Sequence, residues 1–217
     1  EPPPPTHPFT ALLVSGGHTL LLDAEGPTGP YRRRGGTRDD AAGEAFDKTA
    51  KLLGLGYPGG ARIDRAAEGG DPAAVAFPKL MAGKDNLDFS FSGLKTAVKY
   101  QVRDLGEFPE AVRDRIAAEF EHAVTDVVVA KTVHALEEHP VHAFVLGGGV
   151  SANRHIRTAL ENLFSTLADA PTLLLPAPGL STDNAVMIGM AGFVAHLRGV
   201  EPLAATDEIQ AAGDLAL

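Results

Sequence analysis

The sequence predicts an α/β lobe in which helices flank a mixed sheet. Short apolar runs suited to strands alternate with longer segments whose apolar residues recur at helical spacing. Two of these runs lead directly into glycine-rich turns, and the second turn leads into a helix. A strand, a glycine turn and a helix N-terminus together are typical of an anion- or nucleotide-binding corner, although a tight turn without a ligand is the alternative.

Composition limits the class of protein. The chain has 217 residues, of which 44% are hydrophobic and 22% charged, so a packed core over one large or two small domains is expected. No apolar run reaches the length of a membrane span, the first residues show no basic-then-apolar pattern, and there is no cysteine. We therefore expect a cytoplasmic protein without disulfides. The net charge of -9 disfavours a broad nucleic-acid-binding surface.

A β-hairpin is expected over residues 10–23, with Ser15-Gly16-Gly17-His18-Thr19 at its tip. Such a tip can turn successive N–H groups toward one anion, or it can be an ordinary turn. Residues 30–38 follow as a glycine-rich loop with four arginines, which either binds phosphate or is solvated.

Helices are expected over residues 39–53 and 61–68, then from Ser92, as N-cap, to about residue 102. The first of these places Asp40, Glu44 and Asp47 on one face, which is either solvated or able to bind ribose hydroxyls or an amine. A long helix is expected from Pro109, because proline favours the first helical turn, to a point before Pro140.

The glycine corner follows an expected strand over residues 143–146. Gly147-Gly148-Gly149 forms the turn, and Ser151 is expected to cap a helix that runs to about residue 163. A further strand is expected over residues 172–175. Ser181 or Thr182 then caps the last helix, so that Asp183 lies in its first turn, as a favourable capping charge or as a ligand at the cleft.

Five segments in order and spacing resemble one family, the catalytic subunit of tRNA threonylcarbamoyladenosine synthase, formerly called O-sialoglycoprotein endopeptidase. They are residues 13–19, 39–60, 87–96, 147–154 and 181–184. The resemblance covers roughly residues 9–195 and implies the actin-like ATPase (ASKHA, ribonuclease H-like) fold.

The domain organisation expected on this basis has three parts. They are a proline-rich linker over 1–8, a C-terminal actin-like lobe over 9–196 with a helical insertion at about 61–140, and a tail over 197–217. The sequence begins with Glu1-Pro2-Pro3-Pro4-Pro5 and has no initiator Met. We therefore expect a piece of a longer protein whose N-terminal lobe precedes residue 1.

The resemblance also implies site residues. Substrate contacts are implied at Leu13, Val14, Ser15, Gly16, Gly17, Asp47, Gly60 and Asn153, with Asn153 on the adenylate. Asp183 is implied as a ligand of a divalent metal (iron, zinc or magnesium). Two further histidine ligands, four residues apart, belong to the family's N-terminal lobe, and no His-x-x-x-His occurs in this chain. No residue is assigned as a general base.

The activity implied is transfer of a threonylcarbamoyl group from threonylcarbamoyl-AMP to N6 of the adenosine beside the anticodon in tRNAs that read codons beginning with A. This piece alone is expected to be inactive. Implied partners are tRNA, a smaller paralogous actin-like subunit and a P-loop ATPase, with a homodimer as a further option and no membrane. Alternatives are a non-catalytic nucleotide-binding or dimerisation lobe, and a carbamoyltransferase or kinase of the same fold. A metalloprotease is disfavoured because the chain lacks His-Glu-x-x-His.

Overall fold

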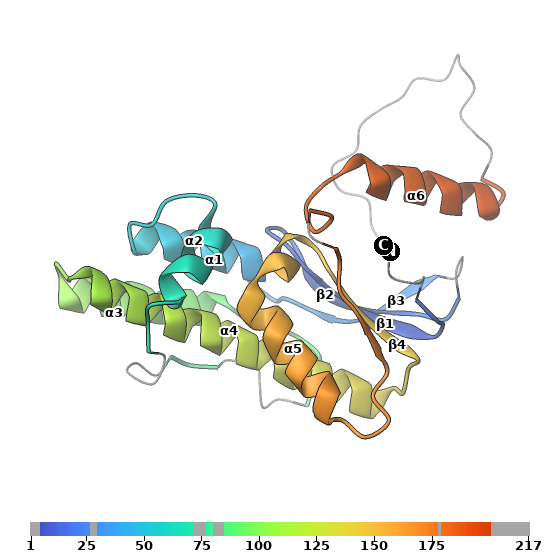
Figure 1. The fold of residues 1–217 in the computed structure, drawn as a ribbon, viewed down its shortest axis with the longest axis horizontal. Coiled ribbons are helices and arrows are strands. Elements are labelled where there is room, and N and C mark those ends of the chain that lie inside the picture. Colours follow the sequence, from blue (N-terminus) through green and yellow to red (C-terminus); the bar gives the residue numbers. More distant parts are fainter. Residues whose placement is uncertain (1–4, 27–29, 72–76, 80–84, 178, 201–217) are drawn as a thin grey trace, which may run out of the picture.

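The fold is built on a five-stranded mixed sheet, seen in a computed structural model that describes residues 5–26, 30–71, 77–79, 85–177 and 179–200 (Figure 1). The strand order is β3-β2-β1-β4-β5. The strands are β1 Phe9–Val14, β2 Thr19–Ala24, β3 Tyr31–Gly36, β4 Ala143–Gly147 and β5 Thr172–Leu174. β2 is antiparallel to β1 and β3, whereas β4 is parallel to both β1 and β5. This confirms the predicted mixed sheet with flanking helices and agrees with a ribonuclease H-like lobe.

The register of the sheet brings two strand ends together. In the β1–β2 hairpin, Val14 pairs with Thr19, so the tip begins immediately after β1. Leu12 of β1 pairs with Leu146 of β4 in the parallel ladder. Because the two strands run in the same direction, their C-terminal ends lie side by side. The hairpin tip and the glycine corner after β4 therefore emerge at the same end of the sheet.

The third strand was not expected, because residues 30–38 read as a basic loop. β3 pairs with β2, with a register shift between Leu21 and Leu22, and forms an edge of the sheet. An edge strand tolerates charged side chains, so its apolar signature is weak. Nη1 of Arg34 lies 2.7 Å from the Asp23 carboxylate, and Nη2 lies 2.6 Å from that of Glu138. Arg34 is therefore held in ion pairs instead of being free to bind phosphate.

The helices are α1 Ala42–Leu52, α2 Gly59–Ala67, α3 Ser92–Leu105, α4 Glu110–Glu138, α5 Arg154–Thr166 and α6 Ala185–Leu197, with a 3-10 turn, η2, over Gly149–Ala152. In Figure 1, α4 and α5 run along one face of the sheet, and α1, α2 and α3 gather at one end. Phe46 of α1 meets Phe120 of α4 edge to face, with ring centroids 5.2 Å apart. Both side chains belong to the main core under the sheet.

Helix starts differ from the expected caps, whereas the extent of α4 between Pro109 and Pro140 is confirmed. Asn153, not Ser151, caps α5, and Asn184, not Ser181 or Thr182, caps α6. The first turn of α3 is capped from a distant segment by Asp39. An amide or carboxylate oxygen close to free N–H groups explains each of these starts.

The last helix is apolar and uncovered. None of the 13 residues of α6 is buried, and Ile188 is 75% exposed. Figure 1 shows α6 standing apart from the sheet. Among the described helices, none is long and apolar enough to cross a membrane. Residues 1–4 of the predicted linker and 201–217 of the predicted tail lie outside the described residues, and the expected domain limits stay predictions.

Candidate functional site

A pocket of about 390 Å³ lies at the sheet edge where β1 and β4 end. It brings together four of the residues singled out from the sequence, namely Gly16, Asp47, Gly60 and Asn153, which come from four separate segments. The rest of its wall is Gly43, Phe46, Tyr57, Pro58, Ala61, Asp64, Gly149, Val150, Ala152 and Thr182. The wall is mostly apolar or glycine, with a few carboxylate and amide groups, which is typical of small-ligand pockets.

The hairpin tip contributes Gly16 to this pocket. The Ser15 Oγ accepts hydrogen bonds from the N–H groups of Gly17, at 3.3 Å, and His18, at 3.0 Å. Those two amides are therefore engaged by the tip itself, and they are not turned outward as a free anion nest. Leu13 and Val14 lie in β1, with Val14 fully buried, and neither is among the residues that line the pocket.

The glycine corner approaches β1 so closely that a side chain at Gly148 would clash with the strand. Gly148 has φ of 88°, and a Cβ there would lie 2.3 Å from the Val14 carbonyl oxygen. Positive φ and this contact both require glycine. Gly149, in contrast, has open space where a Cβ would lie, and it faces the pocket.

Asp47 joins α1 to the start of α2. Its Oδ1 accepts a hydrogen bond of 2.7 Å from the N–H of Gly59, the first residue of α2. A Cβ on Gly59 would lie 2.5 Å from the Asp47 Cα, so the two helices meet backbone to backbone. This contact places Gly60, in the first turn of α2, at the wall of the pocket.

Asn153 is buried, and its side chain is already engaged on two sides. The Oδ1 accepts from the Ile156 N–H at 2.9 Å, which caps α5. The Nδ2 donates to Glu121 Oε1 of α4 at 2.6 Å. Glu121 itself is only 5% exposed, and burial raises its pKa to about 7. No local pattern identifies this partner, because Glu121 lies 32 residues from Asn153 in the sequence.

Asp64 lines the pocket, and it was not among the residues predicted for the site. It lies one helical turn after Gly60 on α2, so the spacing of four residues was a usable signal. Its Oδ2 accepts a hydrogen bond of 2.8 Å from Nε of Arg154, and Arg154 also pairs with Glu68. Arg154 therefore ties the first turn of α5 to α2 across one side of the pocket.

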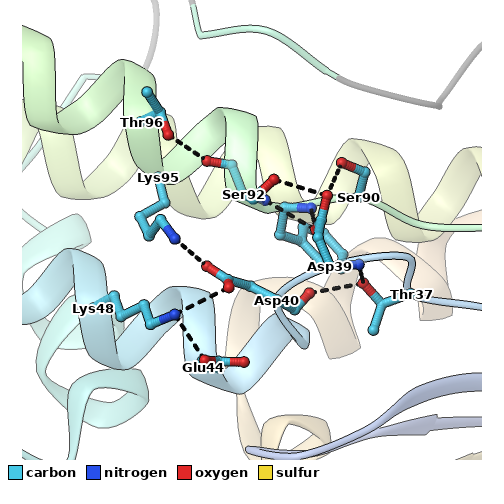
Figure 2. Close-up of polar contacts among 10 residues, drawn as sticks. Thr37, Asp39, Asp40, Glu44, Lys48, Ser90, Ser92, Lys95 and Thr96 are labelled. Carbon is cyan, nitrogen blue, oxygen red and sulfur yellow. Dashed lines mark hydrogen bonds and ion pairs between the residues drawn. The ribbon is translucent and has the colours of Figure 1, made fainter.

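A polar network fixes the entry into α1, as Figure 2 shows. The carboxylate of Asp39 accepts from the Phe91 N–H at 2.8 Å and the Ser92 N–H at 3.1 Å, and from the hydroxyls of Ser90 and Ser92. These hydrogen bonds lower the pKa of Asp39 even though partial burial opposes them. The residues of the 87–96 segment, expected from the resemblance, thus serve here to anchor the start of α1.

Asp40 extends the same network toward α1 and α3. Its carboxylate lies 2.6 Å from Nζ of Lys95 and 3.0 Å from Nζ of Lys48 (Figure 2). Partial burial raises the pKa of Asp40, but the two lysines outweigh that effect and leave it lowered. Lys95 is therefore paired with a carboxylate of the protein itself.

The predicted metal ligand lies at the rim. Asp183 is exposed, and its neighbour Thr182 lines the pocket. Across the described ranges, no group of three or more His, Cys, Asp or Glu side chains is arranged to hold a metal ion. The donors present in this part of the chain therefore do not form a metal site by themselves, which needs at least three ligands.

The sheet, the two glycine turns and the pocket at the ends of parallel strands define an α/β lobe of the ligand-binding class. A family model described as tRNA N6-adenosine threonylcarbamoyltransferase matches residues 1–190, and the chain belongs to this family.

Relatives carry the same name. That of Methylibium petroleiphilum is 49% identical over 189 residues, which are 87% of this chain and 53% of the relative. That of Anaeromyxobacter dehalogenans is 48% identical over 198 residues, which are 90% of this chain and 58% of the relative. The chain thus spans little more than half the length of these curated relatives. A solved ROK family glucokinase from Streptomyces griseus, in complex with glucose and AMPPNP, is 15% identical, with a TM-score of 0.37 over 86% of this chain and 60% of that one.

Proposed function

We propose that this chain forms the adenylate-binding half of a tRNA N6-adenosine threonylcarbamoyltransferase. The observation that carries the proposal is the pocket itself, which gathers Gly16, Asp47, Gly60 and Asn153 from distant segments into one wall. The name shared by the relatives supplies the reaction. Threonylcarbamoyl-AMP is the proposed donor, and N6 of the adenosine beside the tRNA anticodon is the proposed acceptor.

In the proposed reaction, the N6 amine attacks the carbamoyl carbonyl carbon of the mixed anhydride. A C–N bond forms, the C–O bond to the phosphate breaks, AMP leaves, and the amine loses a proton. The glycines of the pocket let the adenylate approach the backbone closely, and Asp47 and Asp64 offer acceptors for its ribose hydroxyls. The contribution of this chain is therefore orientation and exclusion of water, which act through proximity.

A divalent metal and further partners complete the proposal. Asp183 would supply one carboxylate ligand at the pocket rim, and the chemistry of such an ion would be polarisation of an oxygen. Proposed partners are tRNA, a smaller paralogous actin-like subunit and a P-loop ATPase. The candidate metals are iron, zinc and magnesium.

The activity test uses a transferase that contains this sequence and has the full length of the curated relatives. The protein would be incubated with tRNA and threonylcarbamoyl-AMP, and threonylcarbamoyladenosine would be measured by mass spectrometry of nucleosides. We expect Asp47→Ala to lower formation of the product by at least about tenfold, since a pocket acceptor and the anchor of α2 are both lost. Asp104→Ala, an exposed acid on α3, is the matched control. Equal product from both variants would argue against the proposal.

A further inference from the structure

We propose that Glu121 is a positioning residue of the pocket, which holds the Asn153 amide in one orientation so that it caps α5 and presents a fixed face to the ligand. Glu121 lies on α4, outside the pocket wall, and is joined to the wall by its hydrogen bond with Asn153. The inference rests on the proposed function for the identity of the ligand, but not for the contact itself.

The two hydrogen bonds of the Asn153 side chain can be satisfied in only one orientation. An amide has an acceptor oxygen and a donor nitrogen, and exchange of the two would reverse both roles. The Ile156 N–H requires an acceptor, and the Glu121 carboxylate requires a donor. A reversed amide would face N–H with N–H and oxygen with oxygen. Within the described part of the chain the amide makes only these two bonds, so one Nδ2 proton remains for a ligand.

Burial makes the hydrogen bond between Asn153 and Glu121 costly to lose. Asn153 is 8% exposed and Glu121 is 5% exposed, so neither group can exchange its partner for bulk water at low cost. Without the Glu121 acceptor, the amide could rotate or recruit water, and the α5 cap would weaken. Since α5 begins directly after η2, whose residues line the pocket, loosening of the cap would move the pocket wall.

Ionisable groups of α2 and α5 lie beside Glu121. Asp64 and Glu68 of α2, and Arg154 and His155 of α5, line one hollow of about 270 Å³ with it, and His122 follows it on α4. Burial is the main cause that raises the pKa of Glu121, the Asn153 hydrogen bond opposes it, and Asp64 adds to it. Above about pH 7 the carboxylate is charged, so the bond from Nδ2 becomes charge-assisted and stronger.

The first experiment needs no ligand. Amide hydrogen exchange at Ile156 would be measured by NMR in the chain and in two variants that each remove a buried carboxylate from α4. Glu121→Leu removes the acceptor for Asn153, whereas Glu119→Leu removes an acceptor for the Phe77 N–H. We expect exchange at Ile156 to accelerate by about tenfold in Glu121→Leu, as for loss of a buried hydrogen bond, and to stay unchanged in Glu119→Leu. Equal rates in all three proteins would overturn the proposal.

The second experiment is calorimetric titration with AMP and with a non-hydrolysable threonylcarbamoyl-AMP analogue at pH 6 and pH 8. Glu121→Leu should bind the analogue about tenfold more weakly, and Glu121→Gln, which keeps an acceptor oxygen, should restore binding. Glu121→Gln should also lose the gain in affinity that the wild type shows at pH 8. If Glu121→Leu does not fold, the Glu121→Gln titration decides alone, and a pH profile equal to that of the wild type would contradict the proposal. Altered exchange at Ile156 without binding of either adenylate would refute the proposed ligand and leave the positioning role intact.

Discussion

The amide nitrogen of Gly43 lies 3.0 Å from the carbonyl oxygen of Ser15, so the first turn of α1 is bonded directly to the tip of the β1–β2 hairpin. This contact joins two segments that were each predicted from sequence but not predicted to touch. It also explains why Gly16 and Asp47 share one pocket, because the backbone of α1 is held against the tip.

Gly43→Ala should therefore open this contact. An added Cβ would lie 2.7 Å from the Ser15 oxygen and 2.8 Å from the backbone of Gly16, so backbone atoms must move. We expect a loss of about 1–3 kcal/mol in the free energy of unfolding, as for overpacking. Urea denaturation followed by circular dichroism measures it. Gly69→Ala, whose Cβ would make only an ordinary contact with Asp114, is the control and should change stability by less than about 0.5 kcal/mol.

Two adjacent glycines of the glycine corner, Gly148 and Gly149, should differ in how strongly a change to alanine lowers stability. Gly148→Ala places a Cβ at positive φ and 2.3 Å from the Val14 oxygen, so we expect a loss of at least about 2 kcal/mol. Gly149→Ala has open space and should be close to neutral in stability. Thermal unfolding of both variants in parallel measures the difference. Equal melting temperatures would mean that the approach of the corner to β1 is looser than described.

The network around Asp39 should stabilise α1 and α3 together. Asp39→Ala leaves the Phe91 and Ser92 N–H groups and two hydroxyls without their acceptor, so a loss of about 1–2 kcal/mol is expected, as for a lost helix cap. Asp39→Asn keeps one acceptor oxygen and should lose less. The pKa of Asp39 is lowered in the folded state, so its contribution is present above the unfolded pKa and is lost as the pH falls through the folded value. Stability measured from pH 2 to 6 checks this, and a flat difference between wild type and Asp39→Ala would contradict it.

Glu121 should give stability the opposite dependence on pH. Its folded pKa of about 7 lies above the ordinary value of 4.5, so the folded state retains the proton between those values. That stabilisation is complete below the unfolded pKa and is lost as the pH rises through 7, by on the order of 3 kcal/mol. Glu121→Gln should remove this slope between pH 5 and 8. The difference between the two proteins isolates the effect from His155, whose pKa burial lowers and which acts in the other direction.

Local pattern was enough to predict much of the fold. The hairpin of β1 and β2, the strand β4 with its glycine corner, and the long helix α4 follow from apolar periodicity, glycine and proline, which act over a few residues. The edge strand β3 was not predicted, because its run of arginines lacks the apolar pattern of a strand. Its extended conformation depends on pairing with β2.

The site was predictable only in part, for a related reason. Gly16, Asp47, Gly60 and Asn153 were found because they lie in short motifs that carry the family resemblance. Glu121 and the capping role of Asp39 depend on contacts between segments 32 and 52 residues apart, which no local pattern encodes. Asp64 differs, because its spacing of four residues from Gly60 on α2 is a local signal for a shared face.

The central claim is that the pocket between the hairpin tip, α1, α2 and η2 binds the adenylate of threonylcarbamoyl-AMP. The most direct measurement is calorimetric titration of the chain with the non-hydrolysable analogue, comparing Gly60→Ala with Gly60→Leu. A Cβ at Gly60 meets nothing within 4 Å, so both variants should fold, but only leucine fills the pocket. We predict that Gly60→Ala binds within about threefold of the wild type and that Gly60→Leu loses binding by at least about tenfold. Wild-type affinity in Gly60→Leu would contradict the account, because the ligand would then lie elsewhere.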